Sequence, residues 1–210
     1  MLPRARTRHA APCHKDTMDI HVKHLSSAER PQLERHLLAL GAEDRRLRFG
    51  APLNDFAVHT YVERIDFEHD AVFGVSDEEL HLLGAAHLAR IDGQAELGVS
   101  VLPGNRGRGV GGALLARAHM HARNWGTRAL LMHCLIENGA MMHLARKQGM
   151  QIDTGYGEAD AWLKLLPADA VSHFGEVFAQ RVALWDHALK SQAAAARRIA
   201  CAFAARLPAA

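Results

Sequence analysis

The chain has 210 residues, of which 49% are hydrophobic and 23% charged, a composition typical of a globular protein with one sizeable core. The formal net charge of +2, without a block of Lys and Arg, argues against nucleic acid as a partner. No apolar run approaches the ~20 residues of a membrane span, and the His and Cys residues follow no spacing of a metal site or disulfide framework. We therefore expect a cytoplasmic protein without a metal ion that binds neither nucleic acid nor membrane.

The start of the chain differs in composition from the rest. Residues 1–15 contain four Arg or Lys before any apolar run and lack the apolar stretch of a signal peptide. We expect residues 1–17 to form a disordered basic extension, with Met18 as a second candidate for the natural start. A single domain is expected over residues 18–166.

The first third of that domain predicts a strand and three helical segments. Residues 19–25 alternate polar and apolar side chains, the period of a half-buried strand. Ser26-Ser27 supply an N-cap for a helix that ends at Gly41. Two further helical segments are expected at 43–49 and 54–64, the second with these residues facing inward: Phe56, Val58, Tyr61 and Val62.

Three strands are expected next, at residues 71–75, 81–91 and 95–102. Asp92-Gly93 is a strong signal for a type I′ hairpin, and Pro103-Gly104 ends the last strand. The three strands therefore predict an antiparallel meander.

The remainder alternates helices and strands. Helices are expected at 109–125 and 139–147, around a nearly all-apolar strand at 129–136 that reads as covered on both faces. His133 and Cys134 on this strand are expected in the core. A last hairpin is expected at 154–165 around Tyr156-Gly157. Residues 167–210 read as an Ala-rich helical extension, either an extra helical layer or a contact in an oligomer such as a homodimer.

The segment from Pro103 to Gly112 has the features of an anion site. It holds five glycines in nine positions, which let the backbone approach a ligand closely. It also stands at the start of a helix, where free N–H groups and the helix dipole favour phosphate. Arg106 and Arg108 add charge-assisted donors.

Two nucleotide-binding alternatives fit this segment less well. A Walker A loop needs Gly-Lys-Ser/Thr where the chain has Gly109-Val110-Gly111, so a P-loop is excluded. A GxGxxG pattern is present at Gly107, Gly109 and Gly112, with Glu137 after the next strand. Its usual setting is the first unit of a repeated βαβ series, whereas here it follows a meander.

The strand–loop–helix instead resembles motif A of the GNAT superfamily of acetyl-CoA-dependent N-acetyltransferases. Arg106, Gly109 and Gly111 match the family signature Gln/Arg-x-x-Gly-x-Gly/Ala in register. Asn138 to Gly149 is similar to the family's Asn-x-x-Ala-x-x-Leu-Tyr-x-Lys-x-Gly block, and the resemblance covers residues 18–166. Residues 40–49 and 95–96 also resemble, more loosely, the GNAT domain of bacterial protein lysine acetyltransferases.

This resemblance implies an α/β (α+β) GNAT fold with a mixed, splayed sheet of six to seven strands and an extra C-terminal helical segment. It implies that pantetheine lies in the gap of the sheet against the backbone of Val99 and Val101. It further implies that the pyrophosphate is held by the segment that follows, and that Asn138, which also reads as a helix N-cap, contacts the pantetheine. The implied pyrophosphate-binding residues are Arg106, Gly107, Arg108, Gly109, Val110, Gly111 and Gly112.

The implied reaction is direct attack of a primary amine, of a protein lysine or a small molecule, on the acetyl-CoA thioester. Such an amine is mostly protonated at neutral pH, so a base must remove a proton. Glu96 is the candidate, because similar domains carry a catalytic glutamate on this strand; an exposed or ion-paired strand residue is the alternative. In the family a tyrosine protonates the CoA thiolate. Ala145 stands at that position here, and the candidates to replace the tyrosine are Tyr156, His133 and Cys134.

Because of Ala145, a second function remains open, a non-catalytic acyl-CoA-binding or regulatory module. The acceptor is not identified by the sequence. The segment 26–68 and the last hairpin are expected to form the wall of its groove, and their charges are mixed.

Overall fold

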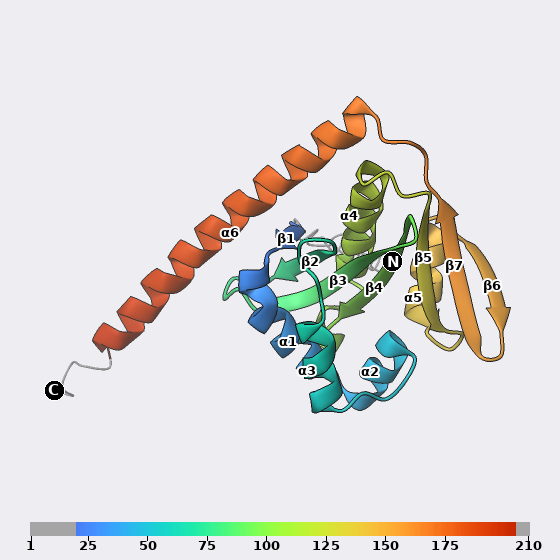
Figure 1. Ribbon diagram of the computed structural model, residues 1–210. Coiled ribbons are helices and arrows are strands. Elements are labelled where there is room, and N and C mark those ends of the chain that lie inside the picture. Colours follow the sequence, from blue (N-terminus) through green and yellow to red (C-terminus); the bar gives the residue numbers. More distant parts are fainter. Residues whose placement is uncertain (1–19, 205–210) are drawn as a thin grey trace, which may run out of the picture.

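The computed structural model describes residues 20–204, so the predicted extension 1–17 and the Met18 start lie outside the described residues. Its centre is a seven-stranded mixed sheet in the order β1-β2-β3-β4-β5-β7-β6 (Figure 1). The strands are β1 Lys23–Leu25, β2 Ala71–Ser76, β3 Leu82–Ile91, β4 Gln94–Val101, β5 Ala129–Leu135, β6 Gln151–Gly155 and β7 Glu158–Lys164.

The predicted meander is present, because β2, β3 and β4 pair antiparallel in sequence order. Asp92 and Gly93 both have positive φ, at 50° and 75°, which a type I′ hairpin requires. The predicted hairpin around Tyr156-Gly157 joins β6 and β7. Tyr156 and Gly157 also both have positive φ, at 52° and 87°. The two hairpins follow from local turn chemistry alone.

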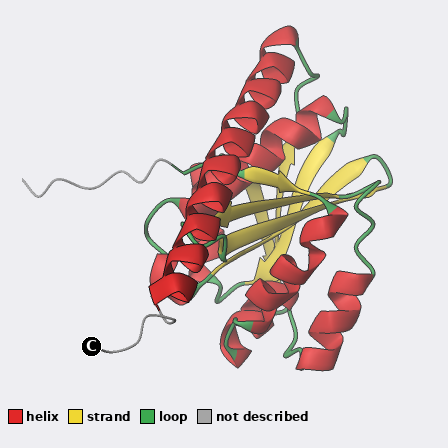
Figure 2. Cartoon of the chain, turned by 90° about the vertical axis from the view of Figure 1, so that its left-hand side faces the viewer, coloured by secondary structure: helices red, strands yellow, loops and turns green. Residues whose placement is uncertain are grey.

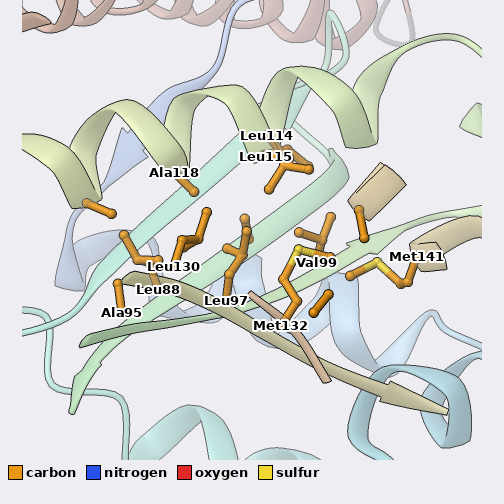
Figure 3. Packing of buried hydrophobic residues seen from close by; sticks show 14 of the residues in the cluster. Leu88, Ala95, Leu97, Val99, Leu114, Leu115, Ala118, Leu130, Met132 and Met141 are labelled. Carbon is orange, nitrogen blue, oxygen red and sulfur yellow. The ribbon is translucent and has the colours of Figure 1, made fainter. Parts of the chain in front are cut away.

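Helices cover both faces of the sheet (Figure 2). One face carries α4 (Val110–Asn124) and α5 (Gly139–Lys147), and the other carries α1 (Arg30–Leu38) and α3 (Asp55–Glu63). In Figure 3, Leu114, Leu115 and Ala118 of α4 point onto Leu88, Leu97 and Leu130 of the strands below. The short helices η1 (Ser27–Glu29) and η2 (Pro103–Asn105) and the helix α2 (Ala42–Phe49) complete the layers.

Three expectations about this region were wrong. Phe56 is 77% exposed, because the α3 residues that face α1 are Val58 and Val62, and Phe56 lies on the opposite side of that helix. β5 is not covered on both faces: Leu130, Met132 and Cys134 are buried under α4 and α5, but His133 on the other face is exposed. β1 begins only at Lys23, so the first strand is shorter than predicted.

The C-terminal extension is one helix, α6 (Ala170–Ala204), that runs past α4 and β1 and away from the sheet (Figure 1). Its inner side is polar: Glu176 bonds Arg117 at 2.8 Å and also pairs with His121 and Asn124 of α4. Its apolar side chains face outward and are exposed, among them Val171, Phe174, Phe178, Trp185 and Leu189. A homodimer contact along this helix stays a prediction.

Candidate active site

The sheet opens between β4 and β5, the two parallel neighbours in the middle of the sheet. They pair only at Ala95–Leu130 and Glu96–Leu131, and beyond these residues they separate (Figure 1). From Leu97 to Val101, β4 is paired with β3 on one edge, and the structure assigns no strand to its other edge. The sheet therefore leaves a free strand edge in its interior, where an extended ligand can add to it.

A cavity of about 670 Å³ continues from this gap. The end of β4, the following glycine segment, α2 and α5 form its walls. Among its lining residues are nine of the ten predicted to bind the cofactor: Val99, Val101, Arg106, Gly107, Gly109, Val110, Gly111, Gly112 and Asn138. The tenth, Arg108, lies in the same loop and donates from Nη1 to Asn105 Oδ1 at 3.4 Å.

The glycine segment has the backbone of an anion cradle. Gly107 and Gly109 have φ of 71° and 91°, which L side chains rarely adopt, and Gly109 is the N-cap of α4. The N–H of Ala113 donates to Gly109 O at 3.0 Å, so the N–H groups of the residues before it are the unsatisfied donors of the helix start. These donors fit a pyrophosphate group.

The loop also packs tightly where a side chain would intrude. A Cβ at Gly111 would lie 3.2 Å from Leu144 Cδ1, and one at Gly109 would lie 3.3 Å from Ile20 Cδ1. Glycine at both positions lets α4 approach its neighbours closely while its backbone remains exposed to the cavity. The residues present therefore fit a phosphate-bearing cofactor.

Arg106, predicted as a phosphate donor, already has two protein partners. Its Nη2 lies 2.8 Å from Asp44 Oδ1 and its Nε donates to Val101 O at 3.0 Å. The side chain thus connects α2 to the end of β4, and Asp44 offsets its charge. A phosphate contact by this side chain stays a prediction.

Asn138 is buried. Its side chain caps α5, which is one of the two roles predicted for this residue. Its Oδ1 accepts from Met141 N at 3.2 Å, and its Nδ2 donates to Leu47 O at 3.1 Å. The residue thus fixes α5 against α2 on the wall of the cavity. A direct contact with pantetheine stays a prediction.

Glu96, the candidate base, is exposed and lies where β4 and β5 begin to separate, outside the cavity lining. It has no hydrogen bond or ion pair within residues 20–204, so the ion-paired alternative is not what the structure gives. Burial lowers the pKa of His87 and the hydrogen bond with Asp160 raises the pKa of His133, and the charge of Glu96 adds a smaller upward contribution to both. Glu96 therefore faces the side of the sheet opposite α4.

The same side holds a chain of four polar residues that sequence reasoning did not identify. Asp70 Oδ2 lies 2.9 Å from His87 Nε2, His87 Nδ1 lies 2.7 Å from Tyr61 OH, and Arg48 Nη2 donates to Tyr61 OH at 3.2 Å. Burial is the main cause that lowers the pKa of His87, so the ring is neutral at pH 7. Its one proton then belongs on Nε2, where the acceptor is a carboxylate, and the Tyr61 hydroxyl donates to Nδ1.

A second buried histidine supports the strand that carries the site. His36 Nδ1 donates to Leu82 O and its Nε2 accepts from Ser100 Oγ, both at 2.9 Å. Burial lowers the pKa of His36, and the charge of Arg48 lowers it further. Ser100, a cavity residue, is thereby held in one orientation.

The three candidates to replace the family's tyrosine as general acid do not line the cavity. Ala145 is buried in the core, and Tyr156 is fully exposed at the tip of the β6–β7 hairpin. Burial raises the pKa of the Cys134 thiol, and His133 is held by Asp160 at 2.6 Å, which raises the pKa of its ring. None of the three is placed to protonate a leaving group in the cavity.

Residues 20–204 contain neither a metal-binding cluster nor a membrane-spanning helix. No cluster of three or more His, Cys, Asp or Glu in that range is arranged to hold a metal ion. No helix in the same range is long and apolar enough to cross a membrane.

Comparison with known proteins gives matches to a family and to solved structures, while no curated protein sequence matches. The GNAT domain of S. lividans PAT superposes with a TM-score of 0.60 at 22% identity, covering 70% of this chain and 90% of that one. The ribosomal-protein-S18-alanine N-acetyltransferase of Escherichia coli gives 0.56 at 16%, covering 72% and 97%. The yncA protein of Salmonella typhimurium, solved with its cofactor acetyl-CoA, gives 0.54 at 16%, also covering 72% and 97%.

These structures share the fold at low identity, and the sequence profile of the acetyltransferase (GNAT) family matches residues 32–150, more than half of the chain. The match includes the opening between β4 and β5 and the glycine segment that follows it. The chain belongs to the acetyltransferase (GNAT) family.

Proposed function

We propose that the protein transfers an acetyl group from acetyl-CoA to a primary amine, with the loop 106–112 holding the pyrophosphate. One observation carries the proposal: the free edge of β4 leads directly into a glycine cradle at the start of α4, within one cavity. An extended pantetheine arm needs the first and a pyrophosphate needs the second. Family membership and the yncA protein, solved with acetyl-CoA, support the same cofactor.

Glu96 is proposed as the general base of the reaction. It lies at the point where β4 and β5 part, and its carboxylate has no hydrogen-bond or ion-pair partner among residues 20–204 that would compete for a proton. A water molecule between Glu96 and the amine would bring the proton within reach, as general bases often require. The acetyl group then passes to the amine nitrogen, the C–S bond breaks, and the thiolate leaves as CoA.

A non-catalytic acyl-CoA-binding module is the second candidate. It is favoured by the buried Ala145 in place of the family's tyrosine and by the lack of a tyrosine or cysteine on the cavity wall. A CoA thiol of ordinary acidity, with a reference pKa near ~8.5, can nevertheless leave without a dedicated acid.

Two measurements separate these functions. Isothermal titration calorimetry with acetyl-CoA tests cofactor binding; no binding at micromolar concentrations would remove both candidates. CoA release, followed with a thiol reagent across amines, amino acids and lysine peptides, tests the transfer. Binding without release for every acceptor would favour the non-catalytic module.

A further inference from the structure

A cationic side chain without an acidic partner lies at the far end of the cavity from the glycine cradle. Arg48 of α2 lines the cavity next to Val99 and Ser100. Its Nε is buried without a hydrogen-bond partner, and it has no ion pair within the described part of the chain. Of the two other arginine or lysine residues that line the cavity, Arg106 is paired with Asp44 and Lys147 is exposed.

The backbone of β4 is shaped to receive this guanidinium. A Cβ built on Gly98 would lie 2.1 Å from Arg48 Cζ, so only glycine lets the guanidinium lie flat against the strand. Phe49 and Tyr61 hold it from the other side, with ring centroids 4.9 and 5.9 Å from Cζ. The head group is therefore held in place by packing and by the Tyr61 hydroxyl, while its buried Nε and its Nη1 have no acceptor in the described part of the chain.

No carboxylate of residues 20–204 forms an ion pair with Arg48. Its histidine neighbours, His36 and His87, are neutral at pH 7, because burial lowers the pKa of each and Arg48 lowers both further. Asp70 is already bonded to His87. Partly buried guanidinium groups are ordinarily paired or bind an anion, because desolvating an unpaired charge is costly.

The anion is not supplied by the cofactor if the cofactor binds as proposed. Gly98 precedes Val101 by three residues, about 10 Å along the strand, and the pyrophosphate cradle begins beyond Val101. The pantetheine arm between these points carries no charge. An anion at Arg48 must therefore belong to the acceptor.

We propose that Arg48 binds a carboxylate of the acceptor, so that the enzyme acetylates amino carboxylates, compounds with a carboxylate a few bonds from the amine. The proposal rests on the proposed acetyl transfer. Glu96 is two residues before Gly98 on the same face of β4, about 6.6 Å along the strand. An amino carboxylate at this place directs its carboxylate to Arg48 and its amine toward Glu96. The fork of a guanidinium suits a carboxylate, which it binds through two parallel N–H donors.

The test compares matched acceptors that differ only in the carboxylate. CoA release is measured with α-, β- and ω-amino acids and with the primary amide of each. The wild-type enzyme is expected to favour the best amino acid over its amide by at least about 10-fold in kcat/KM. The amide of an α-amino acid has the less basic amine, and this bias works against the expected result.

Variants of Arg48 test whether this residue binds the carboxylate. Arg48→Gln is expected to bring the acid-to-amide ratio close to 1 by lowering kcat/KM for the acid, with the affinity for acetyl-CoA unchanged. Arg48→Lys keeps the charge without the fork, and an intermediate ratio is expected. Arg46→Gln is the matched control: it removes the same charge from the same helix, but Arg46 pairs with Glu43 and Glu137 on the surface, so the wild-type ratio is expected.

Three outcomes would overturn this proposal alone: a wild-type ratio near 1, an equal loss for acid and amide in Arg48→Gln, or release of CoA only with amines that lack a carboxylate. The second outcome would place Arg48 at the thioester oxygen instead. If no amine of any kind releases CoA, the proposed transfer itself fails, and the acceptor proposal fails with it.

Discussion

The two ends of the cavity are formed by different groups, one mainly by backbone and the other by side chains. The cofactor end is mainly backbone from one continuous stretch, residues 99–112, with Gly107 and Gly109 at positive φ. At the acceptor end the cavity residue is Arg48, which is connected through hydrogen bonds to three side chains outside the cavity lining: Tyr61, His87 and Asp70. A site made of backbone tolerates changes of side chain but not an added Cβ, whereas a site made of side chains loses its function when a single polar atom is removed.

The largest effect is expected from Glu96→Gln at the acceptor end. If Glu96 is the base, turnover falls by roughly 100- to 10,000-fold, the usual contribution of general base catalysis. The affinity for acetyl-CoA stays unchanged, because Glu96 lies outside the cavity lining. Steady-state CoA release and calorimetry measure the two quantities. Turnover that survives the substitution between pH 6 and 9 would make Glu96 a structural residue.

A smaller effect is expected from Gly109→Val at the cofactor end. A β-branched residue is strained at a φ of 91°, and its Cβ would lie close to Ile20. Strain of about 1–3 kcal/mol predicts a loss of acetyl-CoA affinity of roughly 10- to 100-fold in calorimetry.

Gly104→Ala is the control for this change. Gly104 lies in the same loop, has no positive φ, does not line the cavity and would place its Cβ in open space. Its affinity for acetyl-CoA should equal that of the wild type. Equal losses in both variants would mean that the loop responds to any change of sequence, rather than to its backbone conformation.

The difference between contiguous backbone and separate side chains also explains which end of the cavity could be predicted from the sequence. The proposed cofactor end is contiguous, so the spacing of Arg106, Gly109 and Gly111 was sufficient to predict a glycine loop at the start of a helix, and its role in binding a cofactor stays a proposal. The meander and both hairpins were also predicted, with a type I′ turn at Asp92-Gly93, because Asp92-Gly93 and Tyr156-Gly157 determine the turns locally. Nine of the ten predicted cofactor residues line one cavity.

The acceptor end could not be predicted in this way. Arg48, Tyr61 and His87 are far apart in the sequence and meet only when α2 and α3 pack on the sheet. The available signal was weak: Tyr61 was expected to face inward, and Arg48 lay in a segment of loose family resemblance. Phe56 and His133 were misplaced for a related reason, since the coverage of a face depends on which helices lie over it.

A modest effect on the acceptor end is expected from Tyr61→Phe. The change removes the oxygen that accepts from Arg48 and donates to His87, at a cost of about 1 kcal/mol in the free energy of unfolding. If Arg48 binds the acceptor, KM for the acceptor rises by roughly 3- to 10-fold, with little change in kcat or acetyl-CoA affinity.

The other tyrosine of the chain is the control for this change. Tyr156 is fully exposed, so Tyr156→Phe should leave both the stability and KM unchanged. A rise of KM in both variants, or a loss of acetyl-CoA affinity in Tyr61→Phe, would contradict the division of the cavity into two ends.

The smallest effect concerns the protonation of His36, the buried histidine that bonds Ser100. Burial lowers the pKa of His36 below its ordinary value of 6.5, so the unfolded chain takes up a proton that the folded protein resists. The stability that this histidine contributes is therefore complete above pH 7 and is lost as the pH falls through 6.5. Between pH 7 and 6 the loss is on the order of 0.5 kcal/mol. Urea denaturation at the two pH values, in the wild type and in His36→Gln, isolates this contribution, because the two proteins differ only at residue 36. The wild type should lose more stability than the variant over this interval, and parallel losses would mean that His36 already binds its proton when folded. The affinity for acetyl-CoA should not follow the same pH dependence, because His36 lies outside the cavity lining.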